Sequence, residues 1–82
     1  MGVFVRYDGL RIRYVDKKAT LKDLMQELCR MTGAARIEIL LKHFSVFCNG
    51  KALNYLYTKE PSLMINLFLT NNSTVNVERR AR

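Results

Sequence analysis

The chain has 82 residues, of which 49% are hydrophobic and 26% are charged, and its formal net charge is +7. This length fits one domain with a small core, and the hydrophobic content excludes a disordered chain. No apolar run approaches the roughly 20 residues that span a bilayer, and the first residues lack the basic head and apolar middle of a secretory signal peptide. We therefore expect one soluble intracellular domain over residues 1–82, in the cytoplasm or the nucleus.

The first fifteen residues predict a β-hairpin. Two β-rich segments, Val3–Tyr7 and Leu10–Val15, flank Asp8-Gly9, a dipeptide that favours tight hairpin turns. The second segment alternates apolar and basic residues, so its two faces should differ. On the dry face we expect Leu10, Ile12 and Tyr14, and on the wet, basic face Arg11 and Arg13.

The most complete local signal is an amphipathic helix that follows the polar connector Asp16–Lys18. Its apolar stripe recurs at helical spacing and consists of Leu21, Leu24, Met25, Leu28 and Met31. Thr20 is a good N-cap, and Asp23 stands three residues later in the arrangement of a capping box. Gly33 is suited to the left-handed conformation that closes a helix. We expect this helix to pack across one face of a small sheet.

The middle of the chain is less clearly patterned. Residues 34–44 fit either a short second helix or a strand at Ile37–Leu41, because periodicity does not separate the two in so short an apolar run. Phe44–Cys48 predicts a strand, Asn49-Gly50 its turn, and Lys51–Leu53 a short return strand.

The last third of the chain opens with an irregular polar piece around Pro61. The apolar run Ser62–Thr70 fits either a buried strand or one helical turn with a packed loop. Asn71-Asn72 predicts a turn, and Ser73–Glu78 alternates as a final strand. Arg79–Arg82 is interpreted as a basic tail, and the whole order predicts one α+β domain.

No set of residues suggests catalysis or metal binding. Cys29 and Cys48 are expected as buried thiols rather than as a disulfide. With His43 as the single histidine, they fall short of a four-ligand zinc site. No nucleophile is accompanied by a base and a group to hold developing charge, and the glycines do not form a phosphate-binding loop. We predict a non-enzymatic protein with no cofactor and no metal.

The order of these elements resembles ubiquitin and the β-grasp fold that it typifies. A hairpin with a glycine turn precedes a helix opened by Thr20-Leu21. Asn49-Gly50-Lys51-Ala52-Leu53 is similar to the family's Ala-Gly-Lys-Gln-Leu turn, and Ser73-Thr74-Val75-Asn76-Val77 to its Ser-Thr-Leu-His-Leu last strand. The resemblance covers nearly the whole chain. It implies an α+β, ubiquitin-like β-grasp fold, with a mixed four- to five-stranded sheet packed on one main helix.

The departures from ubiquitin bear on function. A conjugated modifier ends in Gly-Gly, whereas this sequence ends in Arg79–Arg82, so conjugation is not expected unless further residues follow the sequence given. Ubiquitin's aliphatic recognition patch is matched by Phe47 in the middle, but Asp8-Gly9 and Glu78 stand near its other two positions. We expect ordinary ubiquitin readers to bind poorly. Lys51 falls where a chain-linkage lysine would be, although a turn lysine is ordinarily just solvated.

The basic residues are the best candidates for function, because a net charge of +7 favours acidic partners. We predict a non-catalytic ubiquitin-like interaction module that binds the acidic surface of a partner protein through its outer sheet face. The expected contact residues are Arg11, Arg13, Phe47, Lys51 and Arg79. The alternative function is a small module that binds RNA or another polyanion. The simplest explanation of the basic residues is that they only keep the protein soluble. A membrane partner is not expected.

Overall fold

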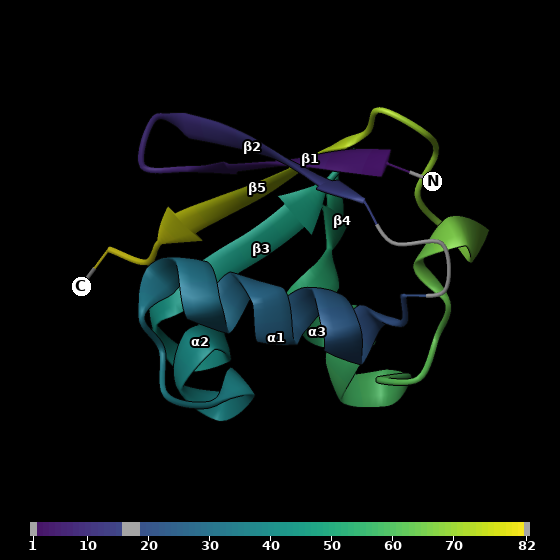
Figure 1. The fold of residues 1–82 in the computed structure, drawn as a ribbon. Coiled ribbons are helices and arrows are strands. Elements are labelled where there is room, and N and C mark those ends of the chain that lie inside the picture. The colour runs from purple at the N-terminus through teal and green to yellow at the C-terminus, as the bar shows by residue number, and fades with distance from the viewer. Residues whose placement is uncertain (1, 16–18, 82) are drawn as a thin grey trace.

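The computed structural model contains a mixed five-stranded sheet with helices packed against it (Figure 1). It describes residues 2–15 and 19–81. In chain order, the strands are β1 Gly2–Tyr7, β2 Leu10–Val15, β3 Phe44–Cys48, β4 Lys51–Ala52 and β5 Thr74–Arg79. The helices are α1 Leu21–Thr32, α2 Ile37–His43 and α3 Leu53–Lys59, and a 3-10 turn, η1, spans Ile65–Leu67. The connector predicted at Asp16–Lys18 lies outside the described residues.

The first and last strands of the chain lie side by side within the sheet. The strand order is β2-β1-β5-β3-β4, and β1 pairs with β5 in parallel. The other neighbouring strands pair antiparallel. A parallel pair requires a long crossover, and here it contains every helix of the described chain. The mixed sheet predicted from the sequence is confirmed.

Two glycine-containing turns set the register of the antiparallel hairpins. Asp8 and Gly9 have φ angles of 51° and 78°, and Asn49 and Gly50 have φ angles of 51° and 79°. Positive φ at both central residues gives a turn whose twist matches that of the flanking strands. Both predicted turns are confirmed.

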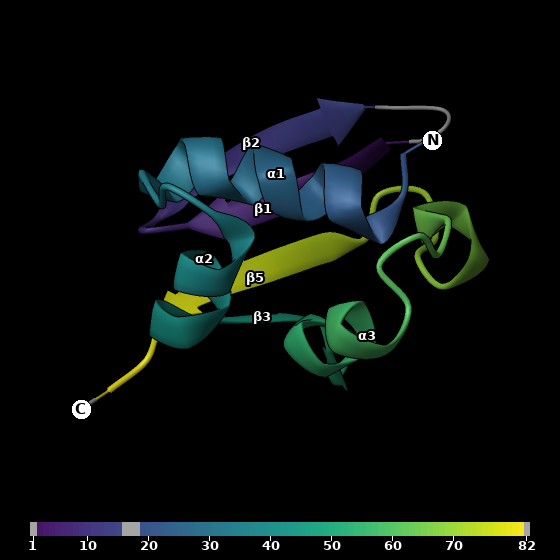
Figure 2. The ribbon, with the colours of Figure 1, turned by 90° about the horizontal axis from the view of Figure 1, so that it is seen from below.

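Helix α1 lies across one face of the sheet, as the view from below shows (Figure 2). At its start, Thr20 Oγ1 accepts from the backbone N–H of Asp23 at 3.2 Å, and Asp23 Oδ2 accepts from the N–H of Thr20 at 2.9 Å. At its end, Gly33 has φ 79° and its N–H donates to the carbonyl oxygen of Cys29 at 2.9 Å. The predicted capping box and glycine terminus are both present.

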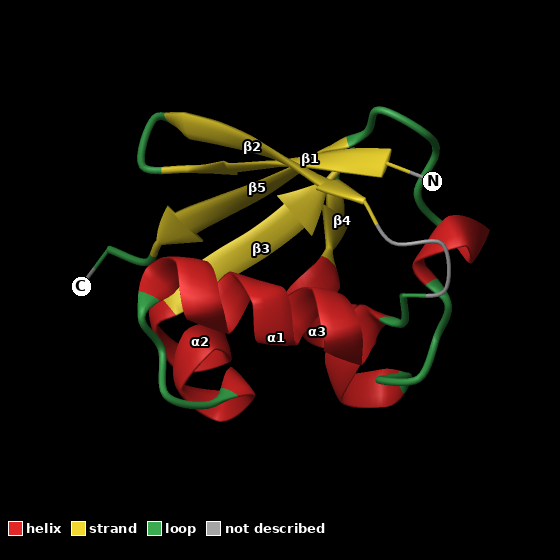
Figure 3. Ribbon diagram, viewed as in Figure 1, coloured by secondary structure: helices red, strands yellow, loops and turns green. Residues whose placement is uncertain are grey.

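The core lies between the helices and the face of the sheet that they cover (Figure 3). Strand β3 shows the pattern, because its first, third and fifth residues are buried and the two between them are half-buried. The buried side chains of the strands and of α1 include Val3, Val5, Leu21, Leu24, Met25, Leu28, Val46, Val75 and Val77. Every helix among the described residues lies on this side, and none of them covers the opposite face of the sheet.

The dry face predicted for β2 is only partly dry. Leu10 and Ile12 pair with Tyr7 and Val5, so they share the helix-side face as expected. Leu10 is nevertheless 62% exposed and Ile12 45% exposed. The reason is that β2 is an edge strand with a neighbouring strand on one side only, so less of the molecule surrounds its side chains.

The chain between β3 and β5 contains more helix than the sequence predicts. Leu53, predicted to end a return strand, instead begins α3 and is fully buried. The side chain of Asn54 ties this helix to the sheet: its Oδ1 accepts from the N–H of Val46 at 2.7 Å, and its Nδ2 donates to the carbonyl oxygen of Phe44 at 2.9 Å. These contacts join distant segments, so local propensity does not reveal them.

Two segments that the sequence left open are now assigned. Residues 37–43 form α2, so a strand at Ile37–Leu41 is excluded. The run Ser62–Thr70 takes the second of its alternatives, a single 3-10 turn within a packed loop. Ile65 and Leu69 anchor this loop in the core, whereas Leu67 is 71% exposed.

Candidate functional site

The uncovered side of the sheet, here called the outer face, is the candidate functional site. Strand alternation places on it the neighbours of the buried valines. Its residues are Phe4 and Arg6 of β1, Arg11 and Arg13 of β2, Ser45 and Phe47 of β3, and Thr74, Asn76 and Glu78 of β5. Most of its positive charge therefore comes from the first hairpin.

Two arginines of β2 stack on one aromatic ring of β1. The guanidinium carbon of Arg11 lies 4.0 Å from the centroid of the Phe4 ring, and that of Arg13 lies 5.3 Å from it. An exposed contact of this kind contributes about 0.5–1 kcal/mol. The ring thus orients two positive charges on the surface without burying either.

Arg13 is also held at its far end. Its Nη1 donates to Oδ1 of Asn72 at 3.0 Å, across the turn that precedes β5. The guanidinium passes directly over Gly2, because a Cβ added to Gly2 would stand 2.5 Å from Nη2 and 2.8 Å from Cζ of Arg13. Because Gly2 has no side chain, the Arg13 guanidinium can lie in this position. The sequence around each residue does not predict this contact.

A row of paired residues crosses the outer face from one edge of the sheet to the other. In order across the strands it consists of Arg11, Arg6, Asn76, Phe47 and Ala52. A hollow of about 350 Å³ opens at its basic end, lined by Arg6, Gly9, Arg11, Thr74 and Asn76. The row thus joins a basic hollow to a half-buried aromatic side chain.

Arg6 and Arg11 stand directly opposite each other on neighbouring strands. Like charges in this position destabilise a strand pair by roughly 0.2–1 kcal/mol. Within residues 2–15 and 19–81, the ion pairs lie around α1 and α2, and neither Arg6 nor Arg11 takes part in one. A carboxylate bound between these two guanidinium groups would relieve their repulsion.

The structure brings three of the five predicted contact residues together on the outer face, namely Arg11, Arg13 and Phe47. Arg79 lies on the opposite face. It pairs with Phe44, and its guanidinium carbon lies 4.8 Å from the centroid of that buried ring. This corrects the expectation that Arg79 extends the basic outer face, and it is the last residue of β5 rather than the start of a tail.

Lys51 is likewise separated from the outer face. It pairs with the buried Cys48, whereas its neighbour Ala52 pairs with Phe47. Its exposed side chain borders an apolar hollow of about 400 Å³ at the β4 edge, which also includes Tyr55 and Phe68. Alternation in a two-residue strand is the reason for this separation.

The contact residues expected from the sequence included neither Phe4 nor Arg6. The available signal was the alternation of β1, which places Phe4 and Arg6 on the face opposite to Val3 and Val5. What the alternation did not contain was the stacking of both β2 arginines on the single ring of Phe4.

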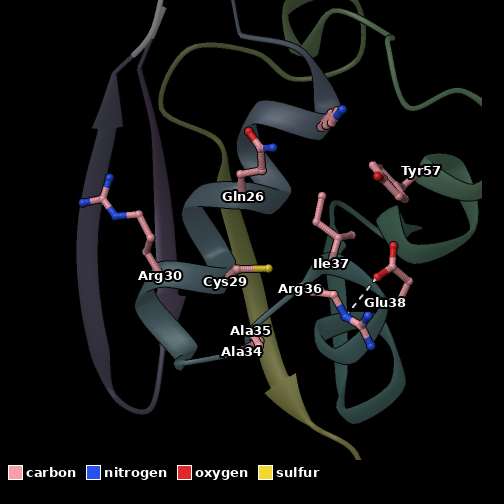
Figure 4. Close-up of a pocket in the computed structure, with 10 residues that line it drawn as sticks. Gln26, Cys29, Arg30, Ala34, Ala35, Arg36, Ile37, Glu38 and Tyr57 are labelled. Atoms are coloured by element: carbon pink, nitrogen blue, oxygen red, sulfur yellow. Dashed lines mark ion pairs between the residues drawn. The ribbon is translucent and has the colours of Figure 1, made fainter.

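A larger hollow of about 600 Å³ lies in the helical layer, between α1 and α2 with Tyr57 of α3 at its side (Figure 4). Cys29 points toward Ile37 there, and an ion pair joins Arg36 to Glu38 at 3.6 Å. Burial, and secondarily the charge of Glu38, raise the pKa of the Cys29 thiol. A raised pKa leaves less of the nucleophilic thiolate at neutral pH, so this hollow offers no activated nucleophile.

Both cysteines are free thiols, Cys48 buried and Cys29 half-buried. Burial also raises the pKa of the Cys48 thiol. In the part of the chain that the structure describes, no three His, Cys, Asp or Glu side chains gather as metal ligands. No helix in that part is long and apolar enough to cross a membrane.

Two solved structures share this architecture. The ubiquitin-like domain of an Arabidopsis thaliana protein superposes with a TM-score of 0.64 at 18% identity, over 100% of this chain and 83% of that chain. The fold is ubiquitin-like. A ubiquitin-like protein from the hyperthermophilic archaeon Caldiarchaeum subterraneum matches with a TM-score of 0.54 at 14% identity, over 99% of this chain and 95% of that chain. The ubiquitin-like β-grasp fold predicted from the sequence is confirmed.

Neither a protein-family model nor a curated protein sequence matches this chain. The similarity of the fold is therefore detected by comparing structures and not by comparing sequences. The chemistry of the surface has to be inferred from the residues of this chain. On the outer face, Phe47 pairs with Asn76 of β5, which separates it from Arg6 of β1, and Glu78 lies on the same face of β5. This surface is charged rather than aliphatic.

Proposed function

We propose that this ubiquitin-like domain is a non-catalytic interaction module that binds an acidic segment of a partner protein through its outer face. The observation that carries the proposal is the direct opposition of Arg6 and Arg11, with Arg11 stacked on Phe4 and no ion pair to either arginine among the described residues. Oriented guanidinium groups of this kind suit two-point recognition of carboxylates.

The binding contacts follow from the row across the sheet. A partner carboxylate would enter the hollow beside Arg6 and Arg11, where the side-chain amide of Asn76 offers a further hydrogen bond. Arg13 would bind a second carboxylate on the same edge. Because Phe4 and Asn72 already hold the Arg13 side chain, little side-chain entropy remains to be lost on binding.

Phe47 would supply the apolar part of the interface. It pairs with Asn76 in the centre of the outer face and is half-buried within the domain. Aromatic side chains and arginines on one surface are the residue types typical of energetically dominant interface positions. The expected partner segment therefore carries carboxylates at one end and an apolar side chain at the other.

The test is charge reversal of the arginines on the outer face. Affinity capture from cell extract with the wild type identifies co-purifying proteins, and a titration then measures binding of the purified partner. Arg11→Glu combined with Arg13→Glu is expected to weaken that binding at least about tenfold, because each charge-assisted hydrogen bond contributes roughly 1.5–3 kcal/mol.

The matched control reverses two arginines of the helical layer, Arg30 and Arg36, which alters the net charge equally. Equal weakening by both double variants would mean that net charge alone, not the outer face, attracts the partner. The alternative function, binding of RNA or another polyanion, is tested by titration with mixed oligonucleotides at two salt concentrations. Binding to a phosphate backbone weakens steeply as salt increases, and tight salt-dependent binding would replace the protein-partner proposal.

A further inference from the structure

The chain leaves the sheet at the end of β5 (Figures 1 and 2). Four basic side chains, from the end of α2 and the end of β5, line a hollow there. Lys42 and His43 end α2, Arg79 ends β5, and Arg80 follows it. Together with Ala81 they line a hollow of about 410 Å³. None of the side chains that line this basic hollow is acidic.

The backbone and side chains of the two arginines are held in place. The N–H of Arg80 donates to the carbonyl oxygen of His43 at 2.9 Å, and Nε of Arg80 donates to that of Phe44 at 3.3 Å. Arg79 lies over the Phe44 ring at 4.8 Å. These contacts leave the terminal amino groups of Arg80 and the guanidinium edge of Arg79 without partners among residues 2–15 and 19–81.

Two backbone carbonyl oxygens at the end of α2 already accept hydrogen bonds. The carbonyl oxygen of Leu40 accepts from the N–H of Phe44, and that of His43 accepts from Arg80. Lys42 and His43 occupy the last turn, where positive charge is favourable. The hollow therefore keeps the positive charges of one lysine and two arginines, and a histidine ring stands beside them.

We propose that this basic hollow is an anion site for a phosphate monoester group. Such a group carries a charge of about −1.5 to −2 at pH 7 and three strong acceptor oxygens. The fork of an arginine matches those oxygens with two parallel hydrogen bonds, and the lysine adds a point charge. A carboxylate brings one negative charge and two oxygens, so it would leave part of the site unsatisfied.

Two carboxylates lie near one arginine of the hollow without pairing with it. Arg79 also borders a second hollow, of about 310 Å³, together with Asp8 and Glu78. Neither carboxylate forms an ion pair with Arg79 in the described chain. Glu78→Gln removes one of these two negative charges and should therefore strengthen phosphate binding. If Glu78 itself contributed to the anion site, the same substitution would weaken binding.

The experiment is an amide NMR titration of the protein with inorganic phosphate, with chloride replaced at constant ionic strength. Saturable shifts are expected at Lys42, His43 and Arg80. Arg79→Gln combined with Arg80→Gln should weaken phosphate binding at least about tenfold. Arg11→Gln combined with Arg13→Gln removes the same charge from the outer face and should leave the affinity unchanged.

Because Arg80 also ties β5 to β3, Lys42→Gln serves as a second variant. Lys42 is exposed, and its substitution should weaken phosphate binding several-fold in a protein whose spectrum is otherwise unchanged. Shifts that do not saturate would overturn the site. Equal weakening by both arginine pairs, or acetate binding as tight as phosphate binding, would do the same.

The phosphate group can belong to a lipid headgroup or to a soluble phosphate monoester, and vesicle binding distinguishes these two sources. Phosphatidylcholine vesicles with and without a phosphatidylinositol phosphate are tested for co-sedimentation with the wild type and with the Arg79/Arg80 variant. Retention on the phosphorylated vesicles alone, lost in the variant, assigns a lipid headgroup. Saturable NMR shifts without vesicle binding assign a soluble phosphate monoester, and the absence of both overturns the proposal.

Discussion

The two faces of the same sheet are built from alternate residues of the same strands and yet have opposite chemistry. Where Val46 and Val77 point into the core, their neighbours Phe47 and Asn76 point to the outer face. The helix-covered face is selected for volume and dryness, because any polar group there needs a buried partner. The outer face has no such constraint, so arginines could accumulate on it at little cost to folding.

The contacts on the two faces also differ in size. Full burial of a large aliphatic side chain contributes about 1.5–3 kcal/mol, whereas an exposed cation–π contact contributes about 0.5–1 kcal/mol. Stability should therefore depend on the helix-covered face and partner binding on the outer face. Substitutions on each face test this separation.

The largest effect is expected from Leu28→Ala in the middle of α1. Leu28 is 0% exposed, so its truncation removes apolar contacts and leaves a cavity. The free energy of unfolding should fall by about 2–5 kcal/mol, measured by urea denaturation. Phe47→Ala is the control on the outer face, and an equal loss there would contradict the division between the faces.

An intermediate effect is expected from Asn54→Ala, which removes the side chain that joins α3 to β3. The N–H of Val46 would lose its acceptor and the carbonyl oxygen of Phe44 would lose a donor. An unsatisfied buried group costs about 1–3 kcal/mol, so urea denaturation should show a loss of that order. Asn66→Ala, at an exposed position, should lower the free energy of unfolding much less. An equal loss in the two variants would show that the hydrogen bonds of Asn54 contribute nothing to stability.

The smallest effect on stability is expected from Arg11→Gln combined with Arg13→Gln. The lost contacts with Phe4 are partly offset, because the repulsion between Arg6 and Arg11 disappears. The free energy of unfolding should change by less than about 1 kcal/mol, measured by thermal and urea denaturation. A loss comparable to that of Leu28→Ala would mean that the outer face is structural rather than a binding surface.

The sequence by itself determined the features that depend on neighbouring residues. The capping box of Thr20 and Asp23, the terminus at Gly33 and the two positive-φ turns involve groups only a few positions apart. Strand alternation is equally local, and it placed Arg11 and Arg13 on the outer face. These local signals were sufficient to predict the ubiquitin-like fold.

Only the tertiary structure decided the features that depend on what packs against what. Helix α3 forms where Asn54 meets the backbone of β3, and Leu10 and Ile12 remain exposed because β2 is an edge strand of the sheet. The register of β5 against β3 carries Arg79 onto the Phe44 ring, away from the arginines of the first hairpin. Each outcome is set by contacts between distant segments, whose energies no local pattern contains.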